Sequence, residues 1–171
     1  MAPTASMRDK SEPMATSPAV ARPTMVAPPR SSLVTGPRWV TGQHGFDSLP
    51  LLVRPGSVIA VGSRDDKPDY DYPDGVALHL FGLEALSTAK VHVPALGGAN
   101  DADDARFEVT RDGADLTVRR TAGRDLPWSV VLPAGIEATM VTGGEALPQI
   151  PGTGFGVRAV SDIVTMSVTT P

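Results

Sequence analysis

The most conspicuous polar cluster in the chain is the run DDKPDYDYPDG at residues 65–75, which holds five carboxylates in eleven residues. Several oxygen atoms close together are what a hard cation such as Ca²⁺ binds. An EF-hand loop beginning at Asp69 would need an oxygen ligand at its fifth position, where Pro73 stands, and Glu at its twelfth, where Leu80 stands. We therefore predict a turn-rich connector with solvated Asp side chains, no metal site and no cofactor.

Other residues that could support catalysis are few. Two carboxylates can act as the acid and nucleophile of a glycosidase, but acids so close in sequence on an exposed loop rarely acquire the different pKa values that these roles need. His44, His79 and His92 are the only imidazoles, and no third ligand has the spacing of a metal site. The sequence contains no Gly-x-Ser-x-Gly motif and no Cys. We predict no catalytic residue.

Four aromatic side chains are able to stack on a sugar ring: Trp39, Tyr70, Tyr72 and Trp128. Trp128 alternates with Val130 and Leu132, a pattern that places it in a core. Tyr70 and Tyr72 lie beside the acidic run. With Trp39, they are the candidates for carbohydrate contact.

Composition restricts the function further. With a net charge of −4, the chain lacks the basic field that nucleic acids require. No run approaches the length of a membrane span, and the N-terminus lacks the apolar region of a secretory signal. We expect a cytoplasmic protein that binds neither nucleic acid nor membrane. The excess of Arg over Lys, 12 to 3, suggests a GC-rich bacterial source.

The elements that must position these residues are short strands. Gly and Pro number 17 each, which disfavours long helices. Alternating segments recur from residue 76 to residue 168, and Asp112-Gly113 separates two of them, as in a type I′ hairpin. About eight such strands and no amphipathic helix predict an all-β fold, an antiparallel β-sandwich.

The first 60 residues have a different texture. Residues 1–35 contain six Pro, no aromatic residue and few large aliphatics, so we predict a disordered tail. Two continuous apolar runs follow, at residues 49–53 and 57–61, joined by Arg54-Pro55-Gly56. Runs of this kind are typical of strands covered on both faces.

Three stretches arrive in an order that resembles the C-terminal β region of glycoside hydrolase family 31, closest to the bacterial α-xylosidases. They are GPRWV at 36–40, GFDSLPLLVRPGSVIAV at 45–61 and PDYDYPDG at 68–75. The resemblance implies that residues 36–63 are the last strands of a truncated proximal β-sandwich and that residues 64–171 are a distal C-terminal β-sandwich. The family's Lys-x-Asp-x-Gly-Glu and Trp-x-Asp-Met-Asn-Glu motifs, which carry its catalytic Asp residues, do not occur in this sequence.

The resemblance therefore implies a non-catalytic structural fragment of an α-xylosidase or α-glucosidase-like enzyme, whose partner is the catalytic (β/α)₈ barrel of a parent or neighbouring chain. The residues expected to pack between domains are Leu51, Val53, Val58, Ile59 and Val61. Uncovered, residues 49–61 would cause self-association. Two alternatives stay open: a free-standing carbohydrate-binding module, and an accessory subunit that docks onto a separately encoded barrel.

Overall fold

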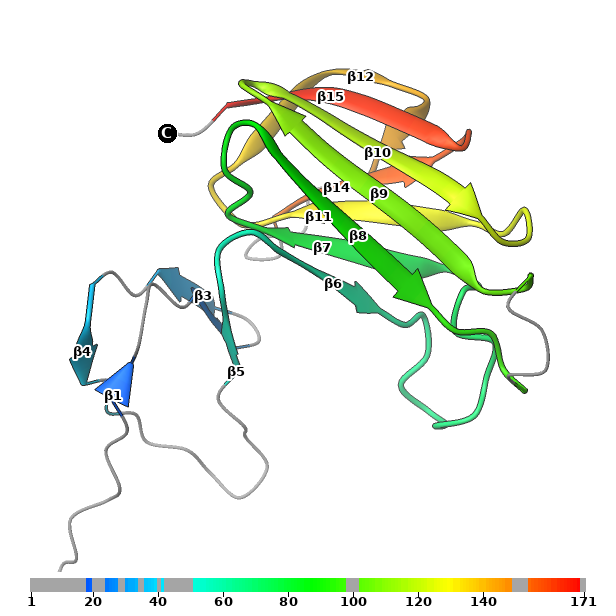
Figure 1. Ribbon diagram of the computed structural model, residues 1–171, viewed down its shortest axis with the longest axis horizontal. Coiled ribbons are helices and arrows are strands. Elements are labelled where there is room, and N and C mark those ends of the chain that lie inside the picture. Colours follow the sequence, from blue (N-terminus) through cyan, green and yellow to red (C-terminus); the bar gives the residue numbers. More distant parts are fainter. Residues whose placement is uncertain are drawn as a thin grey trace, which may run out of the picture.

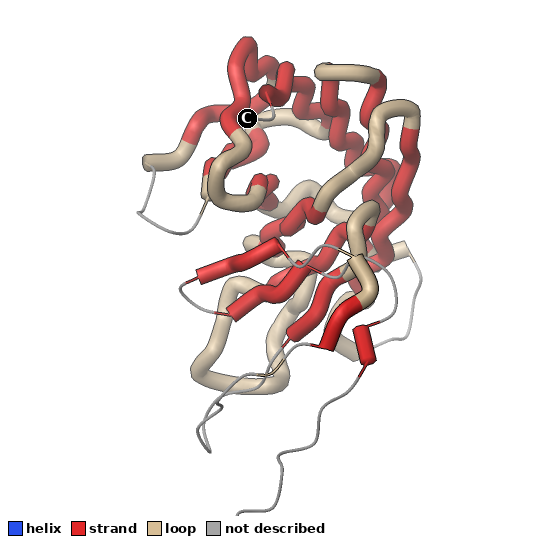
Figure 2. The backbone as a smooth tube through the Cα atoms, turned by 90° about the vertical axis from the view of Figure 1, so that its left-hand side faces the viewer, coloured by secondary structure: helices blue, strands red, loops and turns tan. Residues whose placement is uncertain are grey.

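The computed structural model describes residues 18–19, 24–27, 30–33, 36–39, 41, 51–97, 102–148 and 154–169. All regular structure in these ranges is β-strand, which confirms the predicted all-β class (Figure 2). In the same ranges there is no helix with the length and apolar character needed to cross a bilayer.

Two five-stranded sheets form a sandwich (Figure 1). Sheet 1 has the order β12-β15-β10-β9-β8, from Glu137–Thr142, Ile163–Thr169, Asp115–Ala122, Ala105–Asp112 and Ser87–Val93. Sheet 2 has the order β13-β14-β11-β7-β6, from Gly144–Ala146, Phe155–Ala159, Trp128–Leu132, Val76–Phe81 and Ser57–Val61. All neighbours pair antiparallel except β7 and β11, which are parallel. The predicted antiparallel β-sandwich is thus confirmed, with one parallel pair at its centre.

The hairpin between β9 and β10 is present, with Asp112 opposite Asp115. Its two loop residues are therefore Gly113 and Ala114, and of these only Gly113 has a positive φ, of 60°. A glycine with positive φ at the first loop position is typical of a type II′ turn. The hairpin prediction is confirmed, but the expected type I′ turn centred on Asp112-Gly113 is wrong.

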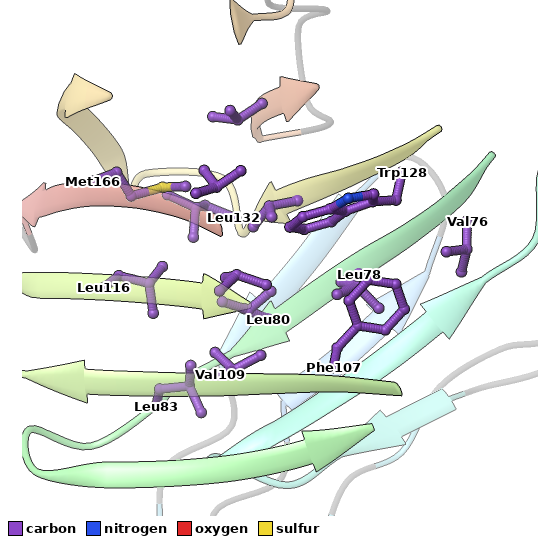
Figure 3. Close-up of a cluster of buried hydrophobic side chains, with 14 of the residues drawn as sticks. Val76, Leu78, Leu80, Leu83, Phe107, Val109, Leu116, Trp128, Leu132 and Met166 are labelled. Atoms are coloured by element: carbon purple, nitrogen blue, oxygen red, sulfur yellow. The ribbon is translucent and has the colours of Figure 1, made fainter. Parts of the chain in front are cut away.

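One hydrophobic core lies between the sheets (Figure 3). Alternate residues of each strand point inward, as the period of two requires. Trp128 is 4% exposed, and its ring lies 5.1 Å from that of Phe107 on the opposite sheet, so its predicted place in the core is confirmed. The residues that are fully buried include Leu78, Val109, Leu116, Val118, Val130, Val157, Val164 and Met166.

Short strands also occur within residues 1–35, where composition predicted disorder. β2 (Thr24–Ala27) pairs with β3 (Arg30–Leu33) and with β5 (Leu51–Val53), and β1 (Pro18–Ala19) pairs with β4 (Arg38–Trp39). In these short strands, cross-strand pairing satisfies backbone N–H and C=O groups, which an argument from composition does not consider. The remaining residues of 1–35 lie outside the described ranges.

Residues 36–63 do not form one unit. β5 pairs with β2 in the small N-terminal sheet, whereas β6 pairs with β7 at the edge of sheet 2. Ser57–Val61 thus pair within sheet 2 although they precede the predicted boundary at residue 63, and that boundary stays a prediction. The chain changes sheet at Gly56, whose φ of 83° suits glycine and whose N–H donates to Phe81 O at 2.7 Å.

Candidate functional site

β6 has one face in the core and one face outside it. Val58 and Ala60 pack against the main core, while Ile59 and Val61 alternate with them and are 38% and 42% exposed. A shift of one residue in the pairing between β6 and β7 would move Ile59 and Val61 into the core and expose the other set. The observed register therefore decides which apolar side chains remain outside. The strand thus presents two β-branched aliphatic side chains on the outer face of sheet 2.

The outer face continues from Ile59 across two more strands. Ile59 lies opposite His79 on β7, and His79 lies opposite Val131 on β11. Burial lowers the pKa of His79, which favours its neutral form. We call these four residues, Ile59, Val61, His79 and Val131, the apolar outer face. Three of the side chains are aliphatic, and none carries a permanent charge.

Two buried apolar residues outside the main core lie near the junction between β5 and β6. Val53 and Phe81 are 7% and 6% exposed, yet neither belongs to the main core. The Gly56 N–H, which donates to the carbonyls of Phe81 and Gly82, holds the junction against the end of β7. Leu52 is 51% exposed. Two apolar side chains, those of Val53 and Phe81, are therefore buried near the point where the chain passes from the N-terminal sheet into the sandwich.

The residues predicted to pack between domains fall into three groups. Val53 and Val58 are covered within this chain, and Ile59 and Val61 are exposed on sheet 2. The backbone of Leu51 pairs with that of Val26, but its side chain lies outside the described part of the structure. Their interdomain role stays a prediction, with Ile59 and Val61 in the position that it requires.

The predicted carbohydrate contacts are not brought together as one platform. Tyr70 and Tyr72 are half-buried and meet edge to face, with ring centroids 4.9 Å apart. Tyr72 packs against the core and donates from its hydroxyl to Pro68 O at 2.9 Å. A Cβ at Gly62 would lie 1.5 Å from the Tyr70 hydroxyl, so that ring packs on the Gly62 backbone. Trp39, on β4, is 59% exposed. These contacts favour packing for the two tyrosines, and sugar binding stays a prediction.

The acidic run is tied to neighbouring basic side chains. Arg64 makes two hydrogen bonds to Asp66, the main reason why the pKa of that carboxyl lies below its ordinary value. Asp71 pairs with Arg124, which also lies 3.6 Å from Asp103. Across the described ranges, no three His, Asp or Glu side chains gather as metal ligands. The run is a series of turns in which two of the five carboxylates, those of Asp66 and Asp71, form ion pairs.

The sequence did not point to Arg120, whose side chain is only 8% exposed. Its guanidinium donates to Asp162 at 2.7 Å, to Asp125 at 2.5 Å and to the carbonyls of Arg124 and Leu126. Burial alone would lower the pKa of Arg120, but the bonds to the two carboxylates outweigh it and raise that pKa. Only the strand pairing reveals this network, because its members are up to 42 residues apart.

Comparison with known proteins shows which family the sandwich resembles. Residues 71–169 match the family model described as "Alpha-xylosidase YicI, C-terminal domain". A curated relative, an alpha-xylosidase of Emericella nidulans, is 45% identical over 47 residues, which are 28% of this chain and 6% of the relative. That relative is fungal, so it does not test the expected bacterial source.

Solved structures show the same fold at low sequence identity. The GH31 dextranase FjDex31A of Flavobacterium johnsoniae, complexed with glucose, matches with a TM-score of 0.59 and 12% identity over 91% of this chain. A glucosidase II alpha subunit matches with a TM-score of 0.51 and 15% identity over 94% of this chain. The chain spans 25% and 22% of those two proteins, and 6% of the curated relative.

Proposed function

This chain belongs to the family of alpha-xylosidase YicI C-terminal domains, and from that premise we propose that it is the non-catalytic structural end of a larger α-xylosidase-like glycoside hydrolase. In this role the sandwich packs against the part of the enzyme that contains the catalytic barrel. The length of the relatives supports the proposal, since each is several times longer than the span that this chain covers.

The observation that carries the structural role is the apolar outer face. Ile59 and Val61 are the outward residues of an edge strand, and the row that begins at Ile59 continues through His79 to Val131. Exposing the apolar area of such a sheet face to water costs about 25 cal/mol per Å² in free energy. A covering layer of protein removes that cost. We infer that a neighbouring part of the parent enzyme supplies this layer.

The pKa shifts of two Asp side chains support a non-catalytic role for this chain. A glycosidase acid needs a raised pKa so that it keeps its proton at neutral pH. Asp66 and Asp104, by contrast, have lowered pKa values because each accepts hydrogen bonds. Both environments favour the ionised carboxylate, which suits a structural ion pair and opposes general acid catalysis.

An activity assay tests the proposal. The purified chain is incubated with an aryl α-xyloside, and we expect no release of the aryl group above the buffer rate. The matched variant is Asp71→Asn, which removes a carboxylate of the acidic run. Turnover by the wild type that Asp71→Asn abolishes would overturn the proposal, because it would place a reacting carboxylate within this chain.

A second candidate function rests on Trp39. Its indole is 59% exposed, a condition for stacking on a sugar ring, and it favours the alternative of a carbohydrate-binding module. Calorimetric titration with isoprimeverose, xyloglucan oligosaccharides and maltose separates the two functions. Saturable heat that Trp39→Ala abolishes would favour the module. Heats equal to those of dilution would leave the structural role.

The third candidate is an accessory subunit, a separate chain that has the same structural role. In that case the apolar outer face docks onto a separately encoded barrel. Adding the chain to such a barrel and measuring aryl α-xyloside turnover distinguishes this form from a covalently continuous enzyme. A rise in turnover that the double variant Ile59→Thr/Val61→Thr removes is the result expected of docking in trans.

A further inference from the structure

The outer face of sheet 1 carries a hollow that the proposed function does not use. Its volume is about 370 Å³, and it lies over the strands β8, β9 and β10. The polar side chains that line it are Lys90, His92, Arg106, Glu108 and Thr121. Three of these five are cations or become cations on protonation, in a chain whose net charge is −4.

Strand register places two of the basic groups side by side. His92 lies directly opposite Arg106, and Lys90 lies directly opposite Glu108. Glu108 lies opposite Lys90 and Arg119 in the sheet and not opposite Arg106. The guanidinium of Arg106 is therefore free of a directly opposed carboxylate on its neighbouring strand.

Among the described residues, the buried carboxylate beside the hollow is that of Asp104, whose pKa is lowered mainly by its hydrogen bonds and to a smaller extent by the charge of Arg106. Asp104 is 6% exposed, and its Oδ1 accepts the Ala95 N–H at 2.8 Å while its Oδ2 accepts His92 Nε2 at 2.6 Å. These bonds fix the imidazole at the rim of the hollow. Within the described residues, the side chains of Lys90 and Arg106 make no hydrogen bond or ion pair.

We propose that this hollow binds an oxyanion, held by the guanidinium of Arg106 with His92 and Lys90 beside it. A guanidinium presents parallel N–H donors that match the two oxygens of a carboxylate or phosphate. The volume lies in the range of small-molecule sites and exceeds what a single inorganic ion fills. The aliphatic stems of Lys90 and Arg106 provide apolar surface beside the charges. These features fit a sugar-sized ligand with one anionic group, either a uronic acid or a sugar phosphate.

Nuclear magnetic resonance of the full chain tests the site. The probes are D-glucuronate, glucose 6-phosphate and inorganic phosphate, with D-glucose and sodium chloride at equal ionic strength as controls. We expect saturable shifts of the Lys90, His92 and Arg106 signals with at least one oxyanion, and none with D-glucose. Saturation by glucuronate alone identifies a carboxylate site. Saturation by the phosphates identifies a phosphate site.

Two variants distinguish a built site from general attraction. Arg106→Gln removes a charge-assisted bond, so we expect affinity to fall about tenfold or more. Arg158→Gln removes the same charge from sheet 2, where Arg158 pairs with Glu145, and we expect no change. The proposal is overturned if no oxyanion gives saturable shifts, if sodium chloride produces the same shifts, or if both variants weaken binding equally. No readout depends on glycosidase activity, so this proposal and the proposed function fail separately.

Discussion

On the outer face of sheet 1, a row of threonines crosses all five strands: Thr88, Thr110, Thr117, Thr165 and Thr142 are successive cross-strand neighbours. On sheet 2, the row that begins at Ile59 continues through His79 to Val131. Both rows consist largely of β-branched residues, which suit a pleated strand. They differ in the hydroxyl group, which lets the threonine row face water and leaves the aliphatic row in need of cover.

The edge strands repeat this difference. β8 is an edge of sheet 1 and carries Lys90, whereas β6 is an edge of sheet 2 and has the uncharged sequence SVIAV. The two strands lie against each other where the sheets meet. Natural proteins protect open edges with charges, and an apolar edge without them invites pairing. The outer face of sheet 1 thus has the chemistry of an exposed surface, whereas the β6 side of sheet 2 has the chemistry expected of the contact proposed above.

The largest effect should come from the core that both sheets share. Phe107→Ala removes a ring that is 2% exposed and packs against Trp128, so we expect a loss of about 3–5 kcal/mol in the free energy of unfolding, measured by urea titration. The control is Thr117→Ala, on the outer face of the same sheet. A loss below about 1 kcal/mol for Phe107→Ala would mean that the sheets do not form one core.

A smaller loss is expected where the sheets are linked at one end. Arg120 lies on β10 of sheet 1, whereas Leu126 lies two residues before the start of β11 of sheet 2 and Asp162 lies between β14 and β15. Arg120→Gln leaves several acceptors without donors, and we expect a loss of about 2–3 kcal/mol in urea titration. Arg119→Gln, an outward neighbour on the same strand, is the control. Equal losses in both variants would show that net charge, and not the network, matters.

Exchanging the chemistry of the outer faces tests the comparison directly. Ile59→Thr/Val61→Thr gives sheet 2 the hydroxyls of sheet 1. We expect the unfolding free energy to change by less than about 1 kcal/mol, because both side chains are partly exposed. Self-association, measured by sedimentation velocity, should weaken at least about tenfold, since the two substitutions remove three carbons in total, at about 0.8 kcal/mol for each one that the contact buries.

The reverse exchange is the control for this experiment. Thr117→Val/Thr165→Val makes adjacent positions on sheet 1 aliphatic, and we expect it to create self-association through a face that has none. If the wild type is monomeric at all concentrations and the sheet 2 variant is indistinguishable from it, the apolar outer face is not a contact surface.

The sequence predicts local features of this fold well. Period-two alternation identified the strands of the sandwich and the core position of Trp128, because each residue's face follows from its neighbours. The glycine at 113 identified the hairpin, but not the turn type, which depends on whether Asp112 pairs with Asp115. Composition predicted a disordered tail, whereas β2 and β3 form through pairing that involves residues 51–53.

The candidate sites were less accessible to sequence reasoning. Within the apolar runs, residues 51–53 and 57–61 form strands as predicted, but nothing local in the sequence shows that the chain changes sheet at Gly56. Arg120 was missed because its partners are distant in sequence. The alternation of Lys90 and His92 with Val91 and Val93 was visible, yet Arg106 joins them only through the register of β9.

The smallest effect that we predict concerns the edge of sheet 1. The pKa of Asp104 lies below its ordinary value, mainly because the Ala95 N–H and then the His92 side chain donate to the carboxylate. A lowered native pKa stabilises the fold at pH values above the ordinary Asp pKa of about 3.9, and this contribution is lost as the pH falls through the native value. Asp104→Asn should therefore cost stability near neutral pH and progressively less below about pH 4.

Urea midpoints measured across this pH range check the trend, with Asp112→Asn, on the exposed hairpin, as the control. A constant difference between wild type and Asp104→Asn at every pH would contradict the prediction, because it would mean that the charge of Asp104 adds nothing to the stability of this edge.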